Sequence, residues 1–191
     1  MERTTMTTKT DQAVPSQTLA DQIDPLRILA QLPLRPYQLL GDFRCGKGAL
    51  TIPLAKHTFD GKVYATDESA ASREELETRL AQTRLSNTVV YDPKDEDSTI
   101  EADSLDGAVV ALNLSTLKTS KPAMLKRVSK ALKRGGWAAI IEWTKFDADE
   151  GPALDKRLTE AELVEVGKQA GFRFAEKRDL SSRYYMVMLR K

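Results

Sequence analysis

LLGDFRCGKG, residues 39–48, is the stretch that decides the fold of this chain. Its two leading leucines predict a strand, Gly46 and Gly48 predict a tight turn, and the apolar residues that follow predict a helix over about residues 49–57. Glycines in such a turn let the backbone approach a ligand closely. A strand, glycine turn and helix in this order are typical of the first unit of a nucleotide-binding α/β sheet.

A second apolar strand follows at residues 61–67 and ends on Asp67, with Glu68 next to it as a neighbouring candidate. A carboxylate at this position is where nucleoside-binding sheets hold the ribose, because it accepts two hydroxyl hydrogen bonds at once. The glycine turn and this carboxylate support each other, and together they predict a site for a ligand that contains a nucleoside.

In this order the residues resemble class I S-adenosylmethionine-dependent methyltransferases, over roughly residues 24–191. Within that family the chain is most similar to the small bacterial, ubiquinone/menaquinone-methyltransferase-like group. Asp42 opens the family's Asp-x-Gly-x-Gly-x-Gly loop, but Arg44 stands where that loop has its first glycine. The segments that carry the likeness are residues 42–48, 63–67, 104–110, 132–137 and 170–172.

The resemblance implies that S-adenosylmethionine is the cofactor and that the loop surrounds its methionine part. Asp42 would accept a hydrogen bond from the cofactor's ammonium, and Gly46 and Gly48 would pass beneath the ribose and sulfonium. Arg44 leaves two alternatives open. In the first, cofactor binding is retained, because Arg44 swings outward or reaches the methionine carboxylate as a charged donor. In the second, Arg44 relaxes the loop away from binding.

Two further residues follow the third and fourth predicted strands. Asp92, with Asp95 as a rival, stands where the family often contacts the amino group of adenine. Asn113 ends the fourth strand and points toward the edge where open α/β sheets bind ligands. The run Asn-Leu-Ser-Thr at residues 113–116 lacks the Asn-Pro-Pro-Tyr of some methyltransferases that act on nitrogen, so no catalytic residue is assigned. Arg157 either holds an acidic substrate or forms a surface salt bridge.

Alternating strands and helices predict a doubly wound α/β fold with a mostly parallel, seven-stranded Rossmann-like sheet. The last strand is antiparallel, because a short loop cannot make a parallel crossover. Residues 1–20 are expected to be a disordered leader and residues 21–191 one methyltransferase-like domain. The local predictions are a Ser72 helix cap, a fourth strand over 105–114, a helix over 123–133 closed by Gly135, and a capping box at 159–162.

Composition excludes several classes of protein. Twenty-nine basic and 28 acidic residues give a net charge of +1, which provides no general attraction to nucleic acid. Cys45 is the single cysteine, so an internal disulfide and a cysteine metal cluster are excluded, and no metal is expected. No apolar run reaches the ~20 residues of a membrane span. A cytoplasmic location is expected, and the oligomeric state is left open.

The function predicted from these features is methyl transfer to a small-molecule acceptor by in-line displacement, driven by positioning rather than by a dedicated acid or base. Arg44 and the missing motif after the fourth strand favour an alternative, a catalytically lapsed protein of this fold that acts as a binding or scaffolding partner. A nucleic-acid methyltransferase and a nicotinamide dehydrogenase are further alternatives.

Overall fold

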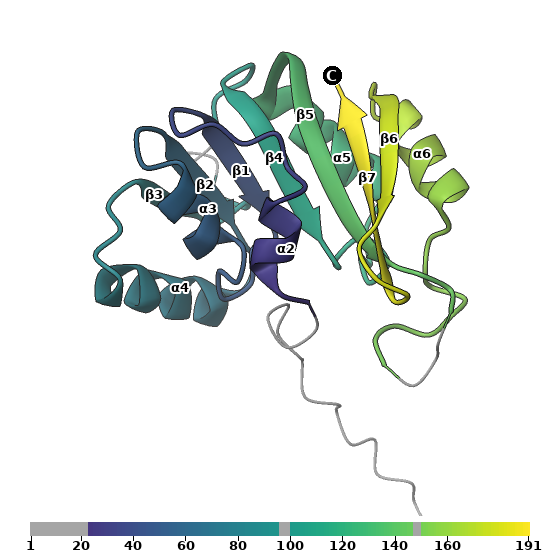
Figure 1. Ribbon diagram of the computed structural model, residues 1–191, viewed down its shortest axis with the longest axis horizontal. Coiled ribbons are helices and arrows are strands. Elements are labelled where there is room, and N and C mark those ends of the chain that lie inside the picture. The colour runs from purple at the N-terminus through teal and green to yellow at the C-terminus, as the bar shows by residue number, and fades with distance from the viewer. Residues whose placement is uncertain (1–22, 96–99, 147–149) are drawn as a thin grey trace, which may run out of the picture.

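The computed structural model describes residues 23–95, 100–146 and 150–191. The leader expected at residues 1–20 lies outside them. The described residues form a seven-stranded sheet in the order β3-β2-β1-β4-β5-β7-β6 (Figure 1). The strands are β1 (Leu39–Phe43), β2 (Lys62–Thr66), β3 (Thr88–Tyr91), β4 (Leu105–Ala111), β5 (Leu132–Trp143), β6 (Arg173–Asp179) and β7 (Tyr184–Arg190). The helices are α2 (Pro25–Leu29), α3 (Thr51–His57), α4 (Ala70–Gln82), α5 (Lys121–Ala131) and α6 (Glu160–Gln169).

Strand β1 lies at the point where the strand order reverses. Leu40 pairs in parallel with Val63 of β2 on one side and with Gly107 of β4 on the other. In open α/β sheets, ligands bind outside the carboxyl ends of the strands at such a switch point. Strand β7 runs antiparallel to both β5 and β6. The sequence predictions of a mostly parallel sheet and an antiparallel last strand are therefore confirmed.

Two apolar layers bury the faces of the sheet. Ile141 of β5 packs on the side of α2 and α3, and Ile140 packs on the side of α5 and α6. In Figure 1 the first of these layers faces the viewer, and α5 lies behind the sheet. A strand buried on both faces reads as a continuous apolar run, which is why β5 was visible in the sequence. Within the described residues, every helix is too short or too polar to cross a membrane.

Several predicted element ends are wrong by a few residues. Ser69, rather than Ser72, caps α4, and its hydroxyl accepts the Ser72 N–H at 3.3 Å. Strand β4 ends at Ala111 because the next residue has a φ of +55°. Helix α5 ends at Ala131, since Leu132 turns extended and starts β5. The glycine expected to close α5 lies inside β5 instead. The capping box of α6 is confirmed.

Candidate active site

The glycine loop keeps a left-handed backbone even where arginine replaces glycine. Arg44 has a φ of +61°, close to the +54° of Gly46 and the +80° of Gly48. This conformation costs a residue with a Cβ about 1–2 kcal/mol. The Asn113 side-chain amide donates to the Arg44 carbonyl at 2.9 Å, and the Cys45 N–H donates to the β2 carbonyl of Thr66 at 2.9 Å. These contacts hold the peptide unit between Arg44 and Cys45, one from Asn113 after β4 and the other from Thr66 of β2.

The Arg44 side chain turns toward the end of β2. Its Nη1 lies 3.1 Å from Glu68 Oε1, and 28% of the side chain is exposed. Its Nε is buried and has no hydrogen-bond partner among the described residues. The Arg44 backbone thus keeps the left-handed conformation that a glycine would have here, and its side chain pairs with Glu68. Glu68, expected near the ribose, is here the ion-pair partner of Arg44.

The Asp67 carboxylate faces the glycine loop. Its Oδ2 accepts the Gly46 N–H at 2.8 Å, and its Oδ1 accepts the Ser69 N–H at 2.9 Å. A carboxylate has about four lone-pair sites, so two acceptor positions remain after these bonds. Asp67 is thereby fixed in orientation and still able to accept hydroxyl hydrogen bonds.

Asp42 is a buried carboxyl group near the carboxyl end of the central strand β1, with 3% of its surface exposed. Its Oδ2 accepts the Thr51 hydroxyl at 2.6 Å. Burial raises the pKa of Asp42 to about 6, and the charge of Asp67 adds to the shift while the Thr51 bonds oppose it. Asp42 is therefore mostly ionised at neutral pH and becomes protonated as the pH falls below about 6.

Asp92 is linked to Asp67 through the side chain of Arg73. The Arg73 guanidinium donates to the Asp67 carbonyl at 2.6 Å and to the Asp92 carboxylate at 2.9 Å. Asp95, the rival candidate, donates its N–H to the Asp92 carbonyl at 3.1 Å. The structure thus brings Asp42, Arg44, Gly46, Gly48, Asp67, Glu68, Asp92 and Asn113 together at one edge of the sheet.

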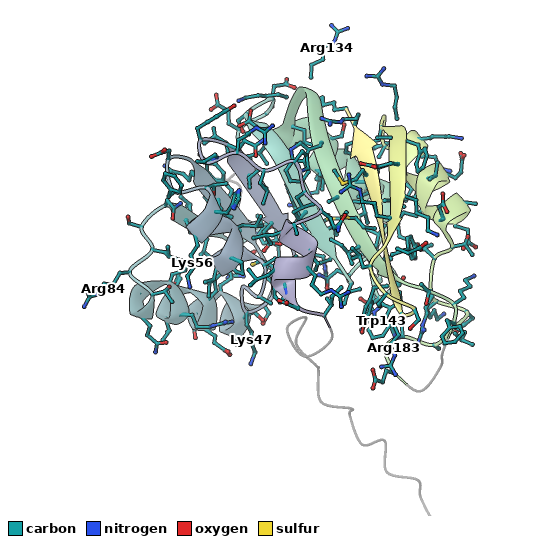
Figure 2. All side chains as sticks on the ribbon, viewed as in Figure 1. Lys47, Lys56, Arg84, Arg134, Trp143 and Arg183 are labelled. Carbon is teal, nitrogen blue, oxygen red and sulfur yellow. The ribbon has the colours of Figure 1, made fainter. Side chains whose placement is uncertain are left out.

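Figure 2 places further side chains at this edge: Lys47 of the loop and Trp143 at the end of β5 lie at the lower side of the view, whereas Arg134 lies at the opposite edge. A hollow of about 210 Å³ lies near Trp143, at the ends of β5 and β6 and the start of α6. Its lining residues are Thr144, Lys145, Leu158, Thr159, Glu160, Lys177, Asp179 and Tyr185.

Arg157 contacts described residues on the connection between β5 and α6, and the expected surface salt bridge is wrong. The side chain is buried, with 2% exposed, and its guanidinium lies 5.1 Å from the centre of the Trp143 ring. It donates to the carbonyls of Thr144 at 2.9 Å and Pro152 at 2.8 Å, and also to that of Glu150. With its donors turned into the protein, Arg157 is not available to a substrate.

Sequence reasoning also missed Glu142, which is fully buried in β5. The available signal was a single carboxylate inside the apolar run 137–143. Its carboxylate accepts hydrogen bonds from the turn after β4, through Leu114 and Ser115.

The described residues contain no group of three or more His, Cys, Asp or Glu side chains that could hold a metal ion.

The loop has room for a ligand on the side of Gly46. A Cβ added to Gly46 would meet no heavy atom within 4 Å, whereas one added to Gly48 would lie 2.3 Å from Leu76 Cδ1. Gly48 is thus favoured by its φ of +80° and by the nearby Leu76 side chain, and Gly46 faces open space beside Asp67. The open space and the two free acceptor positions on Asp67 suit a ligand with hydroxyl donors.

Comparison with solved structures shows the same fold. A SAM-dependent methyltransferase from Aquifex aeolicus is 22% identical, with a TM-score of 0.79 over 87% of this chain and 88% of that chain. The cyclase SpnF is 17% identical, with a TM-score of 0.73 over 88% and 81%. An O-methyltransferase from neocarzinostatin biosynthesis, solved with S-adenosyl-L-homocysteine and 1,4-dihydroxy-2-naphthoic acid, is 22% identical, with a TM-score of 0.73 over 87% and 53%.

A family model described as a methyltransferase domain matches residues 42–138, from the carboxylate that opens the loop into β5. No curated protein matches the chain. The cofactor of this family is S-adenosylmethionine, in agreement with the prediction from the loop and Asp67. The chain therefore belongs to the methyltransferase-domain family, with the class I S-adenosylmethionine-dependent fold.

Proposed function

We propose that this protein binds S-adenosylmethionine at the glycine loop and transfers its methyl group to a small-molecule acceptor. The observation that carries the proposal is the left-handed Arg44 backbone, which leaves Gly46 open and directly beside the Asp67 carboxylate. An arginine at this position therefore does not by itself remove the loop geometry on which cofactor binding depends.

Each residue has a role that its contacts support. Asp67 accepts the ribose hydroxyls through the lone pairs that Gly46 and Ser69 leave free. Asp42 accepts the ammonium group of the cofactor, directly or through water. Asp92, which Arg73 holds, would contact the amino group of adenine.

The chemistry is nucleophilic attack by the acceptor on the sulfonium methyl group that the cofactor supplies. The chain's contribution is to hold both reactants in line, which accounts for a large share of the barrier in such reactions. The hollow of about 210 Å³ beside Leu158 and Tyr185 lies at the same ends of the strands, and we assign the acceptor to it.

The second candidate is a lapsed methyltransferase that serves as a binding partner. The ion pair between Arg44 and Glu68 favours it, because this pair engages a carboxylate beside Asp67. In the proposed function, the ion pair with Glu68 keeps the Arg44 side chain out of the open space at Gly46. Both candidates keep the fold and differ in whether the cofactor binds.

Transfer of label from methyl-tritiated S-adenosylmethionine to a small-molecule metabolite extract tests the proposed function. We expect labelled product with the wild-type protein and none with Gly46→Val, in which a branched side chain occupies the open space. Label that appears equally with both proteins, or with neither, would contradict the proposal.

The pH dependence of ligand affinity follows from Asp42. Its pKa of about 6 means that below this pH an incoming ammonium must displace a proton, so the dissociation constant for S-adenosylhomocysteine should rise as pH falls, approaching tenfold per unit. Calorimetry between pH 5 and 8 measures this, and Asp42→Asn should bind more weakly without that dependence. An affinity that is flat from pH 5 to 7 would remove Asp42 from the site.

The same carboxyl group also affects stability. Because its folded-state pKa is raised above 3.8, it lowers the free energy of unfolding as pH rises from about 4 to 6.

A further inference from the structure

Glu142 is a carboxyl group in an apolar setting. It lies near the end of β5 between Ile141 and Trp143, and none of its surface is exposed. Burial raises the pKa of Glu142. A buried carboxyl group is unfavourable unless several donors surround it, so its donors indicate what the group is for.

The donors come mainly from the turn after β4. Glu142 Oε1 accepts the N–H groups of Leu114 at 2.7 Å and Ser115 at 3.0 Å. Its Oε2 accepts the Ser115 hydroxyl at 2.6 Å and the Trp143 N–H at 3.3 Å. Because β4 has already ended at Ala111, the sheet no longer offers partners to these turn amides. Glu142 supplies those partners and fixes the turn.

One side of this turn reaches the glycine loop. Asn113 precedes the two bound amides, and its side chain donates to the carbonyls of Ala111 at 2.7 Å and Arg44 at 2.9 Å. The Arg44 carbonyl belongs to the residue whose left-handed backbone the loop requires. Glu142 is thus linked to Arg44 through one rigid turn.

The other side of the turn reaches the hollow. The Ser115 hydroxyl oxygen accepts the Leu158 N–H at 3.4 Å, and the Tyr185 hydroxyl donates to the Leu158 carbonyl at 2.7 Å. Leu158 and Tyr185 both line the hollow. The turn at residues 112–116 therefore contacts both the glycine loop and the hollow, and its hydrogen bonds to Glu142 fix its position.

We propose that Glu142 is a positioning residue for methyl transfer, which acts through the turn at residues 112–116 to fix Arg44 on the cofactor side and Leu158 on the acceptor side. The inference rests on the proposed function. Its structural core, the coupling of Glu142 to the loop, is testable without any ligand. An apolar residue at this position would fill the space and leave the Leu114 and Ser115 amides without partners.

The experiment compares Glu142→Met, which removes all four acceptor bonds, with Glu142→Gln. The glutamine oxygen can accept both turn amides, and its NH₂ can donate to the Ser115 hydroxyl. Amide hydrogen exchange of Cys45 and Gly46 is measured without ligand, followed by titration with S-adenosylhomocysteine. We expect Glu142→Met to speed exchange at these two amides about tenfold and to weaken binding by a similar factor, with Glu142→Gln restoring most of both.

Val187→Ala is the matched control, because it destabilises the buried β7 strand and removes none of the four hydrogen bonds to Glu142. If Cys45 and Gly46 exchange no faster in Glu142→Met than in a Val187→Ala protein of equal stability, the inference is overturned, whatever the ligand does. If Glu142→Met does not fold, Ser115→Ala removes the hydroxyl bonds to Glu142 and Leu158 and keeps both turn amides bound, so exchange at Cys45 and Gly46 should then speed by less than tenfold but still more than in the control. Failure of the wild-type protein to bind S-adenosylhomocysteine would instead refute the proposed function. The exchange rates of Cys45 and Gly46 would then still test whether Glu142 fixes the loop.

Discussion

Replacement of Gly46 by valine is expected to abolish S-adenosylhomocysteine binding and to leave the fold intact. A Cβ at this position meets no protein atom within 4 Å, so a valine side chain has room in the free protein. The same space is where we place the ligand. The φ of +54° strains any side chain by about 1–2 kcal/mol and a β-branched valine by more, which lowers stability and leaves the domain folded. Calorimetric titration measures the binding, and urea unfolding measures the stability.

Gly135→Val is a matched control for this variant. Gly135 has a φ of +82° and an equally open Cβ position, but it lies near the start of β5. The neighbouring Arg134 marks that opposite edge in Figure 2. Both valine variants should lose similar stability, and only the Gly46 variant should lose the ligand. Loss of binding in both, or in neither, would place the ligand elsewhere.

Asp67→Asn is expected to weaken S-adenosylhomocysteine binding by about 100-fold, since hydrogen bonds to a charged group contribute about 1.5–3 kcal/mol each. The amide offers one oxygen in place of two, and the Gly46 and Ser69 N–H groups already compete for it. Binding is measured by calorimetry at pH 8, where Asp42 is ionised.

Asp60→Asn provides the comparison for Asp67→Asn. Asp60 is an exposed carboxylate that precedes β2, at the other end of the strand that Asp67 follows. Its substitution removes the same charge and should leave the affinity unchanged. A loss of less than about fivefold in Asp67→Asn would be too small for two charged hydrogen bonds and would argue against a ribose at this carboxylate.

Features set by neighbouring residues were predictable from sequence. Asp67 ends an apolar strand just beyond a glycine turn, and both signals are local. The capping box of α6 is equally local and is found as expected. The helix ends predicted at Ser72 and Gly135 were wrong because strand pairing and cap geometry, rather than composition, decided them.

Features set by contacts between distant residues were not predictable. The left-handed Arg44 depends on Asn113, which lies 69 residues away. The raised pKa of Asp42 depends on how deeply the sheet buries it. Glu142 meets Ser115 only because β4 and β5 are neighbours in the sheet, and 27 residues separate the two in sequence. In each case the tertiary contact, absent from any local pattern, determines the chemistry.

Titration of the unmodified protein with S-adenosylhomocysteine tests the central claim most directly, with Arg44→Gly measured beside it. The left-handed Arg44 backbone and the open space at Gly46 predict saturable one-to-one binding by the wild-type protein. Arg44→Gly should fold more stably by about 1 kcal/mol, because glycine adopts this conformation without strain, and should still bind. Absence of heat and of any thermal shift for the wild-type protein at millimolar ligand, with binding restored in Arg44→Gly, would contradict the account and identify a lapsed methyltransferase.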